Sequence, residues 1–396
     1  MKKASKKTIY LDNASATPAD PAVIAAMEPY FGRIYGNPSS LHALGVQARS
    51  AVESARERVA RVLGAHADEI FFTSGGTESD NLAILGAVEG YVGKAKPHIV
   101  TTNIEHSAVL ETCRALESSG RATVTYVPVE ENGIVDPKKI KKALKKNTIL
   151  VSVMYANNEI GTIQPIREIA KTIRHFKKSR DAQYPLFHTD AAQAMNYLDV
   201  AVERLGVDLL SFSGSKIYGP KGVGALFKKR NIPLARINQG GDQESGLRPG
   251  TENVAGIIGV ATALEIAEKM KAREAKRLTA IRDQFFAKLV RAFPNIVING
   301  DPLLRLPNNI NISVPDISSE LLVIALDAYG ICASAKSACH SGDDSASYVV
   351  GALRSSKENE ITGSVRFSLG RTTKKSDVTE VTSALVEIMH RQNRLP

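Results

Sequence analysis

Four side chains in this sequence combine a reactive group with surroundings that suit it, and the first two are a lysine and a carboxylate. Lys216 lies between the hydroxyl-rich segment 211–215 and a glycine turn at 219–222. A lysine at a strand end in a low-dielectric site has a lowered pKa and condenses with an aldehyde cofactor, although a surface lysine would show the same pattern. Asp190 follows an apolar run, where a buried carboxylate needs a partner such as a protonated ring nitrogen.

The other two reactive groups are a thiol and a guanidinium. Cys339 stands among small residues in a segment poor in apolar content, which favours an exposed, reactive thiol. Cys113 and Cys332 fall within apolar patterns and are more typical of thiols packed in a core. Arg366 alternates with apolar neighbours, so its guanidinium faces away from them, where it would clamp a carboxylate or form a salt bridge on an edge strand.

Two further positions suit an anion or a flat ring. Residues 73–78 end a predicted strand and begin a predicted helix, so backbone N–H groups and the positive end of the helix dipole meet there. A phosphate is the expected ligand, and a plain capped helix start is the alternative. His106 closes the apolar segment from Ile99 and suits a helix start, a core position or a platform for a ring.

Apolar β-type runs alternate with helical patterns through the first two thirds of the chain. The runs near Thr73, His106, Asp190 and Ser213 each lead into a turn or a helix start. This alternation predicts an α/β fold with a mainly parallel sheet that helices cover on both faces. Ligands of such sheets bind at the carboxyl ends of the strands, which is where these residues stand.

A long helical pattern at 254–293 divides the chain. It contains no proline, and we expect it to form a helix that connects two domains. Turn signals with three prolines and a short helical pattern come next, as in a smaller α/β domain. The predicted large domain is therefore 20–255, and the small domain combines 1–19 with 256–396.

Composition and charge exclude several classes of protein. Hydrophobic residues at 43% and charged residues at 23% are ordinary globular values, unlike those of disordered chains, collagens or coiled coils. The net charge of +10 permits anionic ligands. The lysines at 138–146, however, surround Ile140 and Leu144 without interleaved aromatic residues, which indicates the solvated face of a short helix and no direct binding of nucleic acid.

The number of cysteines and the lack of long apolar runs indicate in which cellular compartment the protein is expected. Three cysteines make no disulfide framework, and their spacing lacks the paired short intervals of a structural zinc site, so no metal is expected. We find neither an export signal nor an apolar run of membrane-spanning length. A cytoplasmic protein is expected.

Ten segments spread in order over nearly the whole chain resemble the cysteine desulfurases of the class V aminotransferase family, which use pyridoxal 5′-phosphate. They are YLDNASATP, NPSSLH, FTSGGTESDNLAI, EHSAVL, NNEIGTIQPI, TDAAQ, SFSGSKIYGPKGVGAL, GLRPGTEN, SACHSG and SVRFSLGR. The resemblance implies the type I fold of pyridoxal-phosphate enzymes. It also implies conversion of L-cysteine to L-alanine, with the sulfur left as a persulfide on Cys339.

By that resemblance, Lys216 holds the cofactor covalently, Asp190 pairs with its pyridine nitrogen, and Gln193 approaches its ring hydroxyl. His106 stacks on the ring and assists acid–base steps, while Thr251 reaches in from the second subunit of a homodimer. The residues implied to bind the cofactor are Gly76, Thr77, His106, Asp190, Gln193, Ser213, Ser215, Lys216 and Thr251.

The resemblance also assigns the reaction steps. Cys339, Lys216 and His106 would be catalytic, and Asn157 and Arg366 would bind the carboxylate of the substrate. Lys216 would move the Cα proton and the Cys339 thiolate would attack the substrate sulfur. The persulfide would then pass to an acceptor protein, either an iron–sulfur scaffold or a relay for tRNA thiolation.

This chain departs from the family at two positions. Ser215 replaces the usual histidine before the cofactor lysine, so a hydroxyl stands in place of an imidazolium. Lys336 replaces a glycine three residues before Cys339, where its charge would lower the pKa of the thiol. The predicted cysteine loop at 334–347 resembles the long, mobile loop of the housekeeping desulfurases. The polar stretch 177–185 is longer than the family's turn, and the sequence assigns it no role.

Two other functions fit the same sequence. The first is a selenocysteine lyase or another class V lyase, which the residues at 215 and 336 favour. Full lyase turnover after Cys339→Ser would identify it. The second is a non-catalytic scaffold with the same fold, which would show no cofactor absorbance even after pyridoxal phosphate is added.

Overall fold

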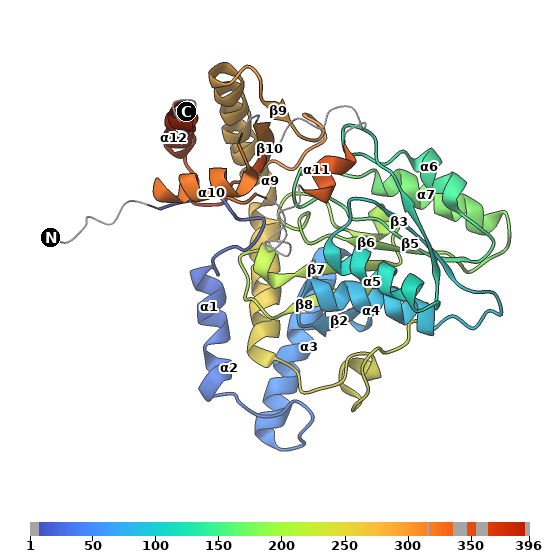
Figure 1. Cartoon of the computed structure of the whole chain (residues 1–396). Helices are drawn as coiled ribbons and strands as arrows, with labels where there is room; N and C mark the ends of the chain where they lie inside the picture. Colours follow the sequence, from blue (N-terminus) through green and yellow to red (C-terminus); the bar gives the residue numbers. More distant parts are fainter. Residues whose placement is uncertain (1–7, 315–316, 336–346, 354–362, 393–396) are drawn as a thin grey trace.

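The computed structural model describes residues 8–314, 317–335, 347–353 and 363–392 (Figure 1). Its central sheet has seven strands in the order β2-β8-β7-β6-β5-β3-β4. Only β8 runs antiparallel to its neighbours β2 and β7, so the predicted, mainly parallel sheet is confirmed. The strands are β2 (Ile70–Thr73), β3 (His98–Thr102), β4 (Thr123–Val127), β5 (Thr148–Ser152), β6 (Leu186–Asp190), β7 (Leu209–Ser213) and β8 (Gly224–Lys228).

Helices cover both faces of this sheet because its strands are apolar on both sides. Phe72 and Val100 join a core with α3, α7 and the first half of α9, whereas their neighbours Phe71 and Ile99 join a second core with α4 and α5. Such two-sided burial is typical of parallel sheets. The helices of this part are α1 (Pro21–Met27), α2 (Pro29–Gly32), α3 (Ala43–Leu63), α4 (Gly76–Glu89), α5 (Ser107–Ser118), α6 (Pro137–Ala143), α7 (Ile166–Lys178), α8 (Val202–Leu205) and α9 (Val254–Ala292).

Three short 3₁₀ helices complete this part of the chain. They are η1 (Ala67–Glu69), η2 (Gly214–Lys216) and η3 (Gln243–Gly246). The second follows β7 directly and carries Lys216, so the predicted strand-end lysine stands at the carboxyl edge of the sheet.

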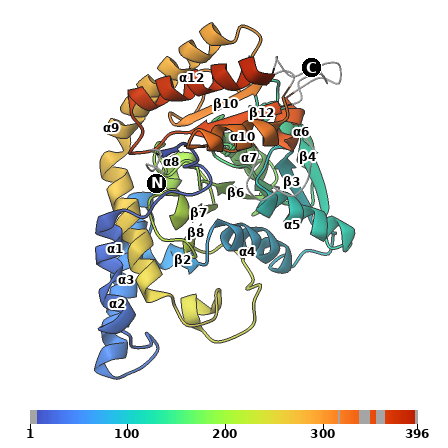
Figure 2. The ribbon, with the colours of Figure 1, turned by 60° about the vertical axis from the view of Figure 1, so that its left-hand side comes forward.

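The long helix α9 links the central sheet to a third hydrophobic core. Leu264, in its first half, packs in the core of the sheet, and Leu278 and Phe285 pack with the C-terminal elements. Figure 2 shows α9 passing along the molecule, with α12 beside its upper part. The predicted connecting helix is thus confirmed as an element, and the domain boundaries stay a prediction.

The C-terminal elements form two small sheets, β12-β10-β9 and β1-β11, and the second joins the N-terminal strand to this part of the chain. Alternation in β12 buries Val365 and Phe367 in the third core and turns Arg366 the other way, as predicted. The elements are β1 (Ile9–Tyr10), β9 (Val297–Ile298), β10 (Asn309–Val314), α10 (Ser319–Ala328), β11 (Ile331–Cys332), α11 (Tyr348–Ala352), β12 (Gly363–Ser368) and α12 (Lys375–Gln392).

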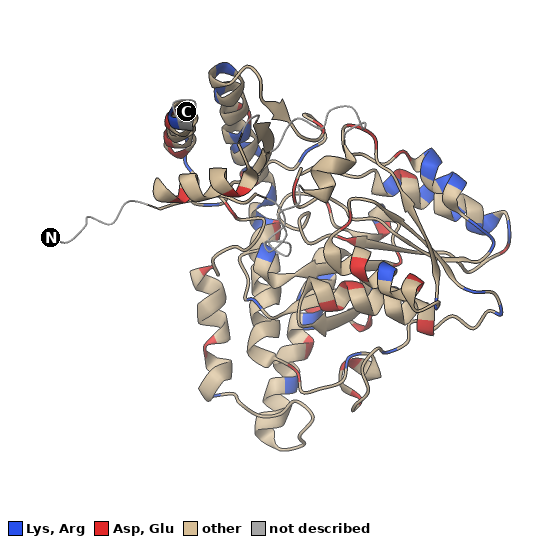
Figure 3. Cartoon of the chain, in the orientation of Figure 1, with Lys and Arg blue, Asp and Glu red and all other residues tan. Residues whose placement is uncertain are grey.

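Two expectations about surfaces and thiols can be compared with the structure. The lysine-rich segment forms α6, in which Ile140 is buried and Lys138, Lys141 and Lys142 are exposed; Figure 3 shows the basic residues gathered on this helix. Cys113 is fully buried, but Cys332 is only partly buried at the edge of the short β1-β11 sheet, so its prediction as a packed core thiol is wrong. Within the described ranges, no helix has the length and apolar character needed to span a bilayer.

Candidate active site

A cavity of about 440 Å³ opens at the carboxyl edge of the central sheet. Parallel strands end at one edge, which brings together side chains that are far apart in the sequence. The segments after β2, β3, β6 and β7 all contribute to its wall, and β12 approaches from the C-terminal part. The predicted site residues that line it are Gly76, Thr77, His106, Asp190, Gln193, Ser213, Ser215, Lys216 and Arg366.

One end of the cavity suits a phosphate. Gly75, with φ 153° and ψ −175°, lets the chain turn from β2 into α4, which begins at Gly76 without a side-chain cap. The first N–H groups of a helix have no partners within it, so those of α4 remain for a ligand. Ser213 and Ser215 add hydroxyls, whose oxygens lie 3.0 Å apart. A Cβ at Gly75 or Gly76 would meet only Ser213, at 3.9 and 3.7 Å, so this cradle is open.

Asp190 also lines the cavity. It is the last residue of β6, is 8% exposed, and accepts a hydrogen bond of 2.8 Å from the N–H of Ala192. Burial raises the pKa of its carboxyl, and the nearby charges of His106 and Lys216 oppose that rise. A buried carboxylate beside the Lys216 ammonium and the His106 ring is suited to face a protonated ring nitrogen.

The chain fixes Lys216 and His106 through backbone contacts. The ammonium group of Lys216 donates to the carbonyl of Ser15, and the carbonyl of Lys216 accepts from Asn196 at 2.7 Å. His106 is the N-cap of α5, and its Nδ1 accepts from the N–H of Ala108 at 3.1 Å. A neutral His106 ring therefore carries its proton on Nε2. His106 stands at a helix start and is only partly buried, and its role as a platform for a ring stays a prediction.

Arg366 presents a buried guanidinium in which one nitrogen atom has no partner among the described residues. It is 1% exposed; its Nη2 donates to Asp12 and to the hydroxyl of Ser15, both at 2.7 Å, and its Nη1 donates to the carbonyl of Asn158 at 2.9 Å. Its Nε has no hydrogen-bond partner among the described residues. Because buried donors are normally paired, this N–H points to a missing acceptor such as a ligand carboxylate.

Three predicted site residues are not at the cavity wall. Asn157 is fully buried: its amide donates to Ile104 and its oxygen accepts from Glu159, while the neighbouring Asn158 lines the cavity in its place. Thr251 is exposed in the turn before α9. Cys339 lies outside the described residues. The roles of all three stay predictions.

The described residues on either side of the predicted cysteine loop are held beside this cavity. Ser334 and Arg366 exchange two backbone hydrogen bonds of 3.1 and 2.7 Å. On the other side, the hydroxyl of Tyr348 donates 2.6 Å to the carbonyl of Glu105, the residue before His106. The hydroxyl of Ser347 donates 2.5 Å to the Glu159 carboxylate. The segment between Ser334 and Ser347 thus starts and ends next to residues of the candidate site.

Sequence reasoning missed four residues of the site. Ser15 and Asn158 form part of the wall and hold Arg366, and Asp80 lies in the wall although it is 1% exposed. His188 lies behind the wall on β6 and is fully buried. Asp80 follows Gly76 by one helical turn and therefore shares its face of α4, which was the available signal.

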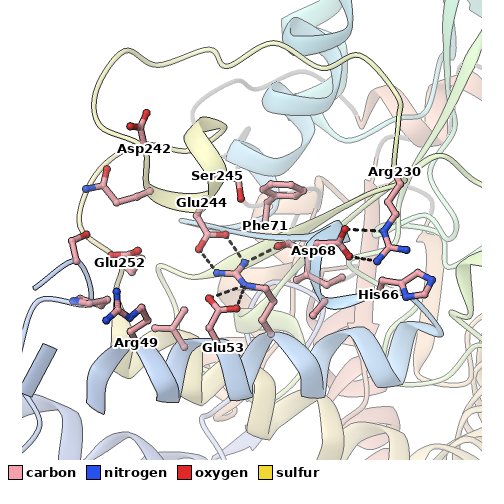
Figure 4. Close-up of a pocket in the computed structure, with 17 residues that line it drawn as sticks. Arg49, Glu53, His66, Asp68, Phe71, Arg230, Asp242, Glu244, Ser245 and Glu252 are labelled. Carbon is pink, nitrogen blue, oxygen red and sulfur yellow. Dashed lines mark hydrogen bonds and ion pairs between the residues drawn. The ribbon is translucent and has the colours of Figure 1, made fainter. Parts of the chain in front are cut away.

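A larger cavity of about 650 Å³ lies beside α3 and contains none of the predicted site residues (Figure 4). Several of its charged groups pair with one another, whereas Oε2 of Glu252 has no hydrogen-bond partner among the described residues. Arg56 makes two hydrogen bonds of 2.8 and 2.7 Å to the carboxylate of Glu244, and Arg230 pairs with Asp68 at 2.6 Å. Cavity volume therefore does not identify the candidate active site. The predicted site residues gather at the smaller cavity, where the parallel strands end.

Comparisons with known proteins agree with this assignment. The model of the family "Aminotransferase class-V" matches residues 9–381. "Cysteine desulfurase IscS" of Dictyoglomus turgidum is 45% identical over 98% of this chain and 95% of its own length. The solved structure of a "NifS-like protein" is 36% identical with a TM-score of 0.89 and covers 97% of this chain and 100% of its own.

A further solved structure contains a ligand. "SspA in complex with cysteine" is 34% identical, with a TM-score of 0.78, over 91% of this chain and 99% of its own. The family model and the curated relative each span nearly the whole chain. The protein therefore belongs to the aminotransferase class V family and, within it, to the cysteine desulfurases.

Proposed function

We propose that this protein converts L-cysteine to L-alanine and leaves the sulfur as a persulfide on Cys339. The observation that carries the proposal is a single cavity that combines Lys216, Asp190, His106 and the unpaired Nε of Arg366. Relatives that are 42 to 45% identical over nearly the full length bear the name cysteine desulfurase.

The proposed cofactor is pyridoxal 5′-phosphate. The uncapped start of α4 with Ser213 and Ser215 suits its phosphate, Asp190 suits its ring nitrogen, and Lys216 suits its aldehyde. A hydroxyl in place of the family's histidine at 215 still donates a hydrogen bond to a phosphate oxygen. When bound, the cofactor supplies an electron sink for the charge that develops at the substrate Cα.

The residues of the chain bind the substrate and move its protons. Arg366 offers Nε to the substrate carboxylate while Asp12 and Asn158 hold its other nitrogens. The amine of Lys216 takes the Cα proton, and its contact with Ser15 holds it at the cavity wall. His106 faces the same space and can exchange a proton through Nε2.

The sulfur step uses Cys339. Its thiolate attacks the Sγ of the substrate and forms a new S–S bond, while the substrate Cβ–Sγ bond breaks. The electron pair of that bond stays on the carbon skeleton, and protonation there gives alanine. Cys339 follows Ser334, which is bonded to the strand of Arg366, by five residues, and five residues span at most about 17 Å. This length brings the thiol within reach of the substrate site.

Partners follow from this chemistry. The persulfide needs an acceptor protein, for which we propose an iron–sulfur scaffold or a relay for tRNA thiolation. We also propose a homodimer in which Thr251 of each chain completes the cofactor site of the other, since it is exposed and absent from the cavity of its own chain. A reducing compartment such as the cytoplasm keeps Cys339 as a thiol.

Mass spectrometry of Cys339 after incubation with L-cysteine tests the proposal. We expect a persulfide on Cys339 and loss of both persulfide and alanine in Cys339→Ser. Cys332→Ser is the control, because this thiol is also partly exposed but is paired into the short β1-β11 sheet. Unmodified Cys339 beside full cofactor loading would refute the sulfur step, and full alanine formation by Cys339→Ser would identify a lyase instead.

A further inference from the structure

A row of buried polar side chains crosses the central sheet directly behind Asp190. His188, on β6, is fully buried, and its two ring nitrogens lie 2.9 Å from the hydroxyls of Ser152 on β5 and Ser211 on β7. The strand register aligns Ser152 with His188 and Asp190 with Ser211. The row thus spans three neighbouring strands beneath the cavity.

Asp80 reaches this row from α4, which packs on β6 and β7. Its side chain is 1% exposed, and its Oδ1 lies 3.5 Å from Nε2 of His188. Among the described residues, this oxygen has no hydrogen-bond partner. Asp80 also lines the cavity, beside Asp190. A buried carboxylate oxygen without a donor is costly if the group is charged and acceptable if it is a neutral acid.

The surrounding groups decide which of the two aspartates is charged. Asp190 accepts from the N–H of Ala192, and the nearby His106 and Lys216 both favour its ionised form. Asp80 has only the hydroxyl of Ser211 to favour its ionised form, and it faces the carboxyls of Asp190 and Glu105. Two carboxyls that share a buried site resist a second ionisation, so the proton goes to the less supported one.

The remaining neighbours of Asp80 do not alter this choice. His188 is buried, which lowers the pKa of its ring to about 3, so it carries no positive charge that would stabilise an Asp80 carboxylate. Glu105 is also buried, which raises its pKa to about 8. Burial and the proximity of Asp190 raise the pKa of Asp80 well above its ordinary value.

We propose that Asp80 is a positioning residue that holds a proton next to His188 and Ser211, so that Asp190 is the charged member of this pair of aspartates. The consequence for a bound cofactor rests on the proposed function, whereas the protonation of Asp80 does not. A neutral Asp80 can form hydrogen bonds within the row of buried polar side chains and adds no second negative charge near Asp190. A second negative charge would compete with Asp190 for the protonated ring nitrogen of the cofactor.

The first test uses the cofactor-free protein. A folded chain that keeps the Asp80 proton loses stability as the pH rises, because the unfolded chain has already released that proton. Asp80→Asn copies the neutral form, so its free energy of unfolding relative to wild type should rise between about pH 5 and about pH 8 in urea titrations. Asp136→Asn, at the exposed N-cap of α6, is the control for removing a surface carboxylate.

A difference between Asp80→Asn and wild type that stays constant or falls over this pH range would overturn the proposal. If Asp80→Asn fails to fold, infrared spectra of wild type and Asp190→Asn, each labelled with ¹³C-aspartate, replace it. We expect the band of a protonated aspartic acid in wild type near pH 8, where an ordinary aspartate is ionised. In Asp190→Asn the band should titrate at lower pH, because the charge of Asp190 is gone, but burial should keep it present above about pH 5. Its absence from wild type, or from Asp190→Asn at every pH above about 5, would contradict the assignment.

The second test follows the visible absorption of protein reconstituted with pyridoxal phosphate. The pH midpoint of the spectral change in Asp80→Asn should stay within about half a unit of wild type, because both side chains are neutral. Asp190→Asn should displace it or lose the cofactor. A displacement of about one unit or more in Asp80→Asn would show that Asp80 is ionised and overturn the proposal. If even wild type binds no cofactor, the proposed function fails and the first test still decides the protonation of Asp80.

Discussion

The cavity beside α3 and the cavity at the strand ends are both lined by charged groups, but the first is centred on a buried ion pair in which each charge has its partner. The carboxylate of Glu244 receives two hydrogen bonds from Arg56 and a third, of 2.7 Å, from the N–H of Phe72. At the strand ends, by contrast, Nε of Arg366 and Oδ1 of Asp80 have no partner among the described residues. The cavity beside α3 also has one unpaired buried atom, Oε2 of Glu252, so the strand-end cavity is distinguished by an unpaired guanidinium donor beside Lys216 and Asp190.

This difference separates structural from functional charges by a physical criterion. A fully paired buried ion pair stabilises its surroundings and leaves no capacity for a ligand. An unpaired buried group is costly in the folded chain alone and is satisfied when a ligand binds. Changes in the first cavity should therefore alter stability, and changes in the second should alter binding and turnover.

The largest effect is expected at the strand ends, from Lys216→Ala. Removing the amine that holds the cofactor and moves the Cα proton should lower alanine formation by about 10⁴-fold or more. Lys142→Ala, on the exposed face of α6, is the control and should leave the rate unchanged. Comparable rates for Lys216→Ala and wild type would remove Lys216 from the reaction.

Glu244→Gln should produce the largest loss of stability. Arg56 and Glu244 have side chains only 11% and 2% exposed, and an unpaired Arg56 would lower the free energy of unfolding by about 3–5 kcal/mol, measured in urea. The KM for cysteine in the folded protein should not change. Asp68→Asn breaks the exposed pair with Arg230, where solvent screening leaves little effect. A changed KM with unchanged stability would reverse the comparison between the two cavities.

Arg366→Lys tests whether the strand-end cavity binds the substrate. Lysine keeps the charge but loses the planar fork, so kcat/KM for cysteine should fall by about 10- to 100-fold, which corresponds to about 1.5–3 kcal/mol. Arg371→Lys is the matched control: Arg371 pairs with Asp20 at 2.9 Å and does not line the cavity. Equal kinetic effects of the two substitutions would show that Arg366 acts only through folding.

Glu105 contributes a pH dependence of stability. Burial raises the pKa of Glu105 from 4.5 to about 8, so the folded chain keeps a proton that the unfolded chain releases. Stability should therefore fall with pH between these two values, by up to about 1.4 kcal/mol per pH unit, and no further above the higher one. Glu105→Gln should remove this slope in urea titrations. An unchanged slope would show that Glu105 is ionised in the folded chain.

The sequence predicted the individual helices and strands better than it predicted which of them lie next to one another. The apolar run Ile70–Thr73 is strand β2, and the long pattern from 254 forms a single helix, because local periodicity determines both. The place of antiparallel β8 between β2 and β7 could not be predicted, since strand order depends on contacts between distant segments. For the same reason, the sequence could not predict the ion pair of Arg56 and Glu244, which are 188 residues apart.

Within the candidate site, motifs predicted which residues line the cavity but not which hydrogen-bond partners each side chain has. Asn157 and Asn158 are alike in sequence, yet the backbone turn directs the first inward and the second to the cavity wall. The sequence analysis predicted no role for Asp80 or His188. Only the packing of α4 on β6 brings them within 3.5 Å of each other.

Borohydride reduction of the cofactor-loaded protein, followed by peptide mapping, tests the central claim most directly. Reduction makes the bond between a lysine amine and the aldehyde carbon permanent. We predict that the pyridoxyl label is on Lys216 and on no other lysine. A label on Lys221, which lines the same cavity, or no label in protein that retains the cofactor colour, would contradict the account.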